Sequence, residues 1–529
     1  MKNKFIIFLV LVAAAITSCK DYLNTQPRDF TPPENYFTTA KELNDALTGV
    51  YDALGQDGTF SRNLVIELAH GSDEGFLKRD AITVTTTPMV YLHTPSDAVI
   101  IAAWRQLYVG INRANYLLAN INKPVMDETE RNAIKGQALF LRGFMYFQLA
   151  HHFGEIPILL TPTVDGNSVD NPKRPLAEVY AQILKDMTEA EALVKTYTQI
   201  GFPGRISKTA VQGILARVCL KMAGEPLKDV TKYADAKMWA EKVIASGIHS
   251  LNASYKQIFI NQSQDLYDTQ AKETIWEIEF SGNNTTGPER EGGRWANQLA
   301  IRNTVMDRGY GYATVGATAT LYRKYEAGDL RRDWNIATFR YLTGASSVGL
   351  GDTVAFAATA IHERDPGKWR RYLELVTPRG QDWGPTNFPV LRYADVLLMY
   401  TEAVLELNEP VDIGSEAYRY YNLVRRRGYG YTATATVPLG VEQLPTVQNI
   451  RDERSRELCF EALRKFDLIR WGNFVQTMKT VGQDINVNAP ATLRYGVLGY
   501  NSVSQKHVLL PIPSQELSLN KSMKQNPLW

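Results

Sequence analysis

The chain has 529 residues, of which 44% are hydrophobic and 22% charged, a globular composition that excludes a disordered, collagen-like or coiled-coil protein. Its 58 basic and 56 acidic residues leave a net charge of +2, so it lacks the basic excess that nucleic-acid-binding proteins usually carry. Three cysteines are too few for a disulfide framework, and no CxxC pair suggests a zinc ribbon.

The first segment has the features of a secretory leader. Two lysines precede an apolar run at residues 5–16, which is too short to span a bilayer because that takes about 20 residues. The small polar residues Thr17 and Ser18 follow and then Cys19, an order typical of a bacterial lipobox. We therefore expect residues 1–18 to be a signal peptide and Cys19 to carry the acyl chains of a lipid anchor.

Helical periodicity dominates the chain up to about residue 250 and again after residue 390. Apolar residues spaced alternately by three and four predict helices over 131–153, 176–195, 207–223, 233–246, 391–408 and 415–427, which form three pairs. Ser207 is a typical N-cap, and Gly154 and Gly224 are placed to end their helices. Successive helix hairpins predict a mainly α scaffold of the tetratricopeptide kind, although the strict repeat consensus is absent.

Between residues 255 and 390 the helical period fades. Residues 275–280 alternate between apolar and polar side chains and predict a strand. Residues 281–294 and 340–390 are rich in glycine, asparagine, threonine and aromatic residues and predict long loops. Because loops of this length usually carry function, we expect the ligand site in this irregular region.

Motifs of several common enzyme classes are absent from the sequence. There is no GxxxxGK[ST] phosphate loop, no GxSxG nucleophile elbow, no HExxH zinc motif and no EF-hand loop. A carboxylate pair for glycoside hydrolysis cannot be recognised from sequence alone, because 56 acidic residues allow many pairs. We therefore expect a binding protein without catalytic residues, cofactor or metal, and keep a surface glycoside hydrolase as an alternative.

Six ordered blocks carry a family resemblance. They are Trp104–Asn115, Gly136–Phe147 with Phe153–Pro157, Gly204–Lys208 with Leu215–Arg217, Leu391–Tyr400 with Glu402–Ala403, Glu453–Leu458 with Phe466–Leu468 and Arg470–Gly472, and Leu510–Pro513 with Glu516, Asn520 and Gln525–Pro527. Together with the lipobox, these blocks are similar to those of the SusD/RagB family of outer-membrane nutrient-binding lipoproteins. The sequence departs from the family pattern at Thr401, usually alanine, and at Ala462, often glycine.

The resemblance implies one SusD-like domain over residues 19–529, with an N-terminal part at about 19–225 and a C-terminal part at about 255–529. It implies tetratricopeptide-like helix pairs beside a loop-rich ligand region. It also implies a lipid-anchored protein on the exterior of the cell outer membrane, which binds oligosaccharides and passes them to a SusC-like TonB-dependent β-barrel transporter. RagB-like members handle peptides, so the same lid role with peptide cargo is the alternative.

Sugar recognition combines aromatic faces, which stack on C–H patches, with planar polar groups that hydrogen-bond to hydroxyls. Loop regions 70–93 and 295–334 contain both kinds of side chain, and the family places equivalent loops beside the ligand. Three of the aromatic residues there have a glycine within two positions, which favours an exposed loop. The candidate ligand contacts are Asp73, Arg79, Trp295, Asn297, Tyr310, Tyr312 and Trp334.

The remaining motif residues are expected to be scaffold. Arg142, Arg392 and Asp395 lie on apolar helices, which predicts buried arginine–carboxylate pairs. Cys219 and Cys459 have apolar neighbours and are expected to be inert core residues.

One long packing helix is predicted over residues 451–472. Its apolar stripe is regular, and two oppositely charged pairs stand four residues apart, at Asp452 with Arg456 and at Glu461 with Lys465. Such spacing favours ion pairs along one helix face. We therefore expect this segment to support the fold rather than to bind ligand.

Overall fold

The structure is a computed structural model that describes residues 36–163, 170–285, 290–342 and 352–529. The expected signal peptide and the lipidation site Cys19 lie outside the described residues. Helices dominate the described chain, whereas its strands are short and form two-stranded antiparallel sheets. The mainly α fold class predicted from the sequence is therefore confirmed.

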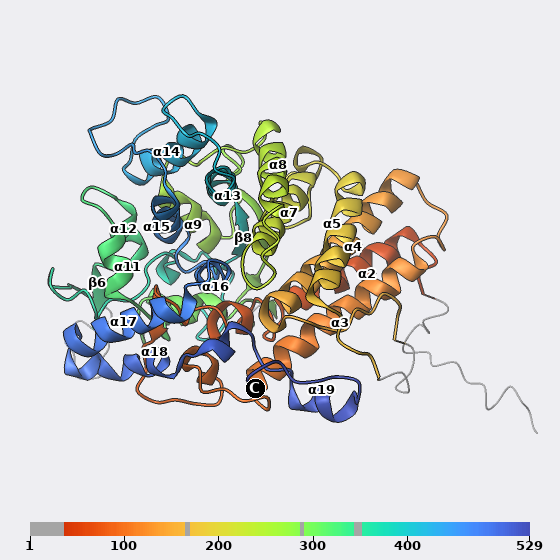
Figure 1. The fold of residues 1–529 in the computed structure, drawn as a ribbon, viewed down its shortest axis with the longest axis horizontal. Coiled ribbons are helices and arrows are strands. Elements are labelled where there is room, and N and C mark those ends of the chain that lie inside the picture. Colours follow the sequence, from red (N-terminus) through yellow and green to blue (C-terminus); the bar gives the residue numbers. More distant parts are fainter. Residues whose placement is uncertain (1–35, 164–169, 286–289, 343–351) are drawn as a thin grey trace, which may run out of the picture.

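Antiparallel helix pairs build the scaffold. The pairs are α2 (Ala40–Gly55) with α3 (Ala98–Asn120), α4 (Glu128–Phe153) with α5 (Leu176–Leu193), α7 (Lys208–Ala223) with α8 (Lys232–Ala245), and α13 (Tyr393–Glu406) with α14 (Glu416–Gly428). Successive pairs also touch, because α3 contacts α4, α5 contacts α7 and α8 contacts α13. The pairs thus run as one continuous row across the molecule (Figure 1). The three pairs predicted from the sequence are confirmed, and α2 with α3 adds a fourth.

The predicted helix ends are confirmed at three positions. Ser207 caps α7, with its hydroxyl accepting a hydrogen bond from the Ala210 N–H at 3.3 Å. Gly154 and Gly224 are the C-cap residues of α4 and α7. At Gly224 a Cβ would lie only 2.4 Å from the carbonyl oxygen of Arg470, so the close approach of these two segments needs glycine.

The region after α8 contains short elements joined by loops. Its helices are α9 (Tyr255–Ser263), α10 (Trp295–Leu299), α11 (Ala319–Lys324) and α12 (Arg331–Asn335). Its strands are β2 (Thr274–Ile278), β3 (Ser281–Gly282), β4 (Arg290–Glu291), β5 (Val315–Ala317), β6 (Phe339–Tyr341), β7 (Thr353–Ala355) and β8 (Phe388–Arg392). The strand predicted near residue 275 is confirmed, and it pairs with β8 just before α13.

The strand pair β1 (Gly75–Leu77) with β5 joins the two loop regions that the sequence singled out. Leu77 lies opposite Val315, and the Lys78 N–H donates to the carbonyl of Thr314 at 2.9 Å. This register brings Arg79, the residue after Lys78, beside the segment that contains Tyr312. Two stretches that are far apart in the sequence therefore form one surface. Arg79 and Tyr312, which meet there, are 233 positions apart.

The predicted helix over 451–472 is wrong in its extent. It is divided into α15 (Val447–Leu458) and α16 (Arg464–Arg470), because Phe460 and Ala462 have left-handed backbones with φ of 65° and 59°. Neither predicted i,i+4 ion pair forms. Arg456 instead pairs with Glu453 at 2.8 Å, and the Lys465 ammonium donates to the carbonyl of Leu68 at 3.0 Å.

The last helices of the chain lie at the lower edge of the view in Figure 1. α17 (Phe474–Asn488) and α18 (Leu498–Ser502) stand together below β6, whereas α19 (Ser514–Leu519) stands apart from them, below α3. A further short helix, α6 (Tyr197–Ile200), lies between α5 and α7 in the chain. Apolar residues of α17 and α18 form a cluster with Phe76 and Tyr91, two residues of the 70–93 loop. This packing holds the loop against the body of the protein.

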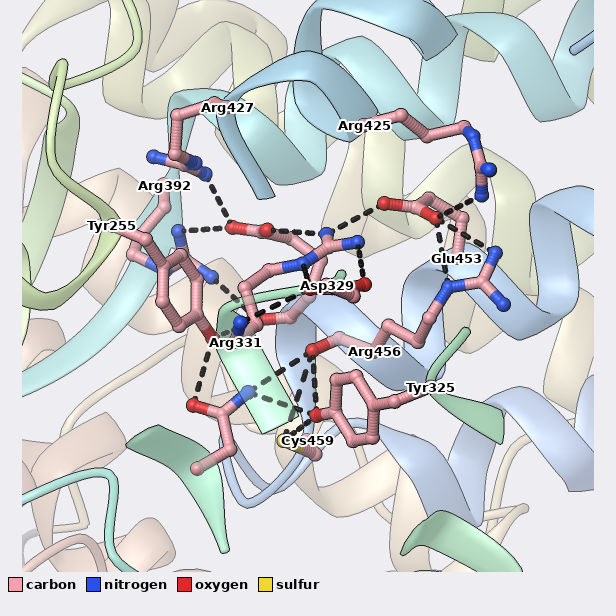
Figure 2. A network of polar contacts seen from close by, with 12 residues as sticks. Tyr255, Tyr325, Asp329, Arg331, Arg392, Arg425, Arg427, Glu453, Arg456 and Cys459 are labelled. Atoms are coloured by element: carbon pink, nitrogen blue, oxygen red, sulfur yellow. Dashed lines mark hydrogen bonds and ion pairs between the residues drawn. The ribbon is translucent and has the colours of Figure 1, made fainter. Parts of the chain in front are cut away.

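Buried arginines and carboxylates fill the interior beneath α15, as Figure 2 shows. Glu453 accepts from the Arg331 guanidinium at 2.6 Å, from Arg456 at 2.8 Å and from Arg425 at 3.4 Å. Arg331 is itself fully buried and also pairs with Asp329 at 2.7 Å. Each of these three arginines and both carboxylates thus has a partner of opposite sign, which makes their burial tolerable.

The buried pairs expected from the sequence are confirmed. Arg142 forms two 2.8 Å bonds to Asp186, and Asp395 accepts from Arg454 at 2.7 Å. Arg392 reaches Glu461 at 2.7 Å, which explains why the chain after α15 turns back rather than continuing as a helix. The two described cysteines are free and buried in the core, also as expected.

Candidate functional site

Asp73 is an interior anchor. It is 1% exposed, and both of its oxygens accept hydrogen bonds from the Arg464 guanidinium at 2.8 Å. The Lys324 ammonium adds a third contact at 3.0 Å. Burial alone would raise the pKa of Asp73, but the positive charges of Arg464 and Lys324 hold this pKa well below its ordinary value. The carboxylate is therefore engaged inside the protein and presents no face to a ligand.

Trp295 is also in the core, with no exposed surface. Its indole N–H donates to the Thr386 carbonyl at 3.1 Å, and its ring meets that of Trp369 edge-on at 4.7 Å. The glycines near Trp295 therefore do not make it an exposed loop residue. Its large apolar ring instead packs β8 against the irregular region.

Asn297 and Trp334 fasten loops to one another. The buried Asn297 amide donates to the carbonyls of Gln381 and Asp382 at 3.0 and 2.8 Å. Trp334 is half-buried, with its indole N–H bonded to the carbonyl of Lys368 and its ring 3.9 Å from the Arg370 guanidinium carbon. Asn297 thus positions the segment that carries Gln381 and Asp382, and the cation covers Trp334.

The other three candidates, Arg79, Tyr310 and Tyr312, lie together and remain partly exposed. The two tyrosine rings are 4.9 Å apart at an interplanar angle of 62°. The Arg79 guanidinium lies 5.3 Å from the centre of the Tyr312 ring and donates to the Tyr312 carbonyl at 3.0 Å. With Arg302, Gln381 and Asp382 they form what we call the tyrosine–arginine site.

Polar groups surround the Tyr312 hydroxyl. It donates to Asp382 Oδ1 at 2.8 Å and accepts from Gln381 Nε2 at 3.0 Å. Arg302 donates to the Tyr312 carbonyl at 3.4 Å. Planar amide, carboxylate and guanidinium groups therefore border an aromatic pair, which is a suitable set for binding adjacent hydroxyls on a sugar ring.

The loop that holds the tyrosines is closed by a backbone bridge between Asn303 and Gly311, whose N–H groups donate to each other's carbonyls at 3.0 and 2.9 Å. Tyr310 and Tyr312 flank Gly311, so an extended backbone places them on the same face. Gly309 has φ of 80°, and a Cβ there would lie 2.5 Å from Arg371 Cβ. Arg371 in turn donates to the Tyr310 carbonyl at 2.8 Å and fixes the loop.

A cavity of about 380 Å³ adjoins the site. Its lining includes Arg302, which it shares with the tyrosine–arginine site, together with Arg340 and Tyr341. Tyr495 is also close to the site. Burial raises the pKa of its hydroxyl, and the nearby guanidinium groups of Arg302 and Arg79 partly oppose this rise. A volume of this size is in the range of small-ligand sites, about 300–1,000 Å³.

The sequence did not single out Arg302, Gln381, Asp382 or Tyr495. Arg302 stands within the predicted 295–334 loop region, so its position was a usable signal. Gln381 and Asp382 belong to the aperiodic stretch 340–390, whose length alone suggested function. Tyr495 comes from a short turn near the chain end, and no local pattern indicates that it approaches Arg79.

A second and larger cavity, of about 640 Å³, lies between α2, β2 and the indole of Trp383. It is rich in carboxylates and includes Glu277, which is only 3% exposed. Burial and the neighbouring Glu279 raise the pKa of Glu277 to about 8. Its carboxyl Oε1 accepts a hydrogen bond from Asn387 at 3.3 Å.

No group of three or more histidine, cysteine, aspartate or glutamate side chains in the described ranges is arranged to hold a metal ion. Within the same ranges, no helix has both the length and the apolar character that crossing a bilayer requires.

Two family models match the chain. The model described as "SusD family" matches residues 368–529, and the one described as "Starch-binding associating with outer membrane" matches residues 21–220. The chain is 27% identical to SusD-like protein P2 of Formosa agariphila over 99% of both chains. It is 25% identical to the starch-binding protein SusD of Bacteroides thetaiotaomicron, covering 80% of this chain and 78% of that one.

Solved structures agree with the sequence matches. A crystal structure of a SusD homologue from Bacteroides thetaiotaomicron superposes with a TM-score of 0.83 at 28% identity, covering 94% of this chain and 98% of that one. A laminarin-binding SusD-like protein superposes with a TM-score of 0.71 at 20% identity, over 93% of this chain and all of that one, which shows a shared fold. The chain therefore belongs to the SusD/RagB family.

Proposed function

We propose that this protein is a non-catalytic binding protein that captures oligosaccharides at the tyrosine–arginine site. The observation that carries the proposal is the solvent-accessible pair Tyr310 and Tyr312, bordered by planar polar groups. A sugar ring stacked on a tyrosine gains apolar contact while its hydroxyls bond to Gln381 and Asp382. The names of the relatives, starch-binding and laminarin-binding, agree with this class of ligand.

Family membership supports the remaining parts of the proposal. We infer that residues 1–18 are removed, that Cys19 carries the lipid, and that the protein is anchored on the exterior of the outer membrane. The description "associating with outer membrane" supports this location. The ligand would then pass to a SusC-like TonB-dependent β-barrel transporter, with transfer driven by binding and lid motion.

Native mass spectrometry of residues 20–529 with a pool of soluble oligosaccharides and short peptides tests the ligand class. A saccharide adduct supports the proposal, and peptide adducts alone favour the RagB-like alternative. Release of shorter saccharides from the pool would instead support a glycoside hydrolase. Co-purification with a β-barrel from the outer-membrane fraction tests the transporter part separately.

Alanine variants then test the site. Tyr310→Ala and Tyr312→Ala should each weaken saccharide binding by about 5-fold, since one aromatic contact contributes about 1 kcal/mol. Tyr267→Ala is the matched control, because Tyr267 is also exposed, at 40%, but lies near the second cavity, where its hydroxyl meets Glu279. If only Tyr267→Ala weakens binding, the second cavity holds the ligand and this assignment fails.

A further inference from the structure

The tyrosine–arginine site contains guanidinium groups that lack an acidic partner. Arg79 and Arg302 both donate to the Tyr312 carbonyl, at 3.0 and 3.4 Å, and neither forms an ion pair with any carboxylate of the described chain. Arg79 Nε is buried and has no hydrogen-bond partner there. Burial and the nearby charge of Arg302 lower the pKa of Arg79, which reports how close the two cations are.

The adjoining cavity carries the same sign of charge. Arg302 and Arg340 line it, and Arg340 is exposed with no ion pair within the described ranges. The lining residue Asp365 is already paired with Lys78 at 2.5 Å. Among the described lining residues the one carboxylate left over is Glu363, so two guanidinium groups face one free carboxylate there.

The acidic groups near the site form no ion pair with Arg79 or Arg302. Asp382 accepts the hydrogen bond from the Tyr312 hydroxyl, and Asp80 is exposed and near Tyr495. Arg308, on the same loop as the tyrosines, adds a further exposed cation. Four cations, Arg79, Arg302, Arg308 and Arg340, and four carboxylates, Asp80, Asp307, Glu363 and Asp382, have no ion pair among the described residues here, so the inference rests on how Arg79 and Arg302 lie together rather than on a net positive charge.

The absence of a carboxylate partner at Arg79 and Arg302 contrasts with the arginines of the interior. Interior arginines such as Arg331 and Arg464 have carboxylates at 2.6–2.8 Å. Two guanidinium groups held near one carbonyl repel each other, which costs free energy unless an anion joins them. A guanidinium pairs well with carboxylate and sulfate because its planar N–H groups match two anionic oxygens. A neutral sugar leaves this arrangement unused.

We propose that the tyrosine–arginine site takes oligosaccharides that carry anionic groups, either uronate carboxylates or sulfate esters. One anionic group lies between Arg79 and Arg302, while a sugar ring beside it rests on the Tyr310 and Tyr312 pair. The cavity with Arg340 accepts a second charged residue of the same chain. This inference rests on the proposed function, because it specifies the ligand of the same site.

Matched saccharide pairs test the inference by titration calorimetry on residues 20–529. One arm compares oligogalacturonates with their methyl esters, and the other compares sulfated oligosaccharides with their desulfated forms. We expect the charged member to bind at least ~10-fold more tightly in one arm, as charge-assisted hydrogen bonds do. A preference in the first arm assigns a carboxylate, and one in the second assigns a sulfate ester. Equal affinities within each pair overturn the inference.

Variants locate the effect. Arg79→Gln and Arg302→Gln should each reduce the ratio of the affinities for the charged and the neutral member towards 1, whatever change they cause in the affinity for the neutral one, and an unchanged ratio would overturn the inference. Arg105→Gln, at an exposed arginine on α3, controls for nonspecific charge attraction. If Arg105→Gln reduces the preference as much as Arg79→Gln does, the inference is overturned. Binding of neutral saccharides alone also overturns it while leaving the proposed function intact, whereas failure to bind any saccharide refutes the proposed function itself.

Discussion

Glu277 is a buried acid whose removal should change the pH dependence of stability. Burial and Glu279 raise its pKa from 4.5 to about 8 in the folded protein. At pH values between about 4.5 and about 8, the Glu277 carboxyl is therefore protonated in the folded protein and ionised in the unfolded chain. Stability from this group is fully present below about pH 4.5 and is lost as the pH rises through about 8.

The variant Glu277→Gln keeps the shape of the side chain and the acceptor for Asn387 but cannot ionise. Each pH unit within the window changes the parent's free energy of unfolding by about 1.4 kcal/mol. Between about pH 5 and pH 8, with the slope reduced near each pKa, the variant should therefore gain about 3.5 kcal/mol relative to the parent. With an unfolding entropy near 2 cal/mol/K per residue, this corresponds to a melting temperature about 3 °C higher.

Scanning calorimetry of parent and variant at about pH 5 and about pH 8 measures this difference. The matched control is Glu128→Gln, which removes an exposed carboxylate from the first turn of α4 and should show no such gain at the higher pH. A variant-minus-parent difference in melting temperature that is the same at both pH values would refute the assignment of a raised pKa to Glu277.

Three further changes test other features. Ala462→Gly should raise stability by about 1 kcal/mol, because φ of 59° is unfavourable for alanine, and a lower melting temperature would contradict this. Arg331→Met leaves three buried carboxylates short of a cation and should cost about 3–5 kcal/mol, measured by denaturant unfolding, whereas an unchanged midpoint would show that they are not charged. Gly309→Ala places a Cβ against Arg371 and should weaken saccharide binding, at a local cost of about 1–3 kcal/mol; unchanged affinity would separate this loop from the site.

The helix pairs were predictable because their signals are local. An apolar stripe repeats within one helix, and a cap such as Ser207 acts within three residues. The prediction failed where distant partners override the local pattern. Residues 451–472 read as one helix, but Arg392 and Lys368, from elsewhere in the chain, hold Glu461 in a position that a continuous α-helix would not give it.

The candidate site was also predictable only in part. The sequence indicated the two loop regions that β1 and β5 bring together, yet it did not distinguish loop residues that face solvent from those that face inward. Tyr310 and Tyr312 remain accessible, whereas Trp295 is enclosed and Asp73 is paired with Arg464. No local pattern in the sequence around Asp73 predicts that Arg464 is its partner. The role of the tyrosines as ligand contacts stays a prediction until binding is measured.

The pairing of Asp73 with Arg464 has a consequence for the order in which a nascent chain matures. The two residues are 391 positions apart, so a chain made from its N-terminus holds Asp73 without its main cation through most of synthesis. The loop around β1 therefore lacks this ion pair until α16 has been made, although β5 and Lys324 are already present. Chains stalled before α16 should expose this loop to protease, and completion of the ligand face should coincide with completion of the polypeptide.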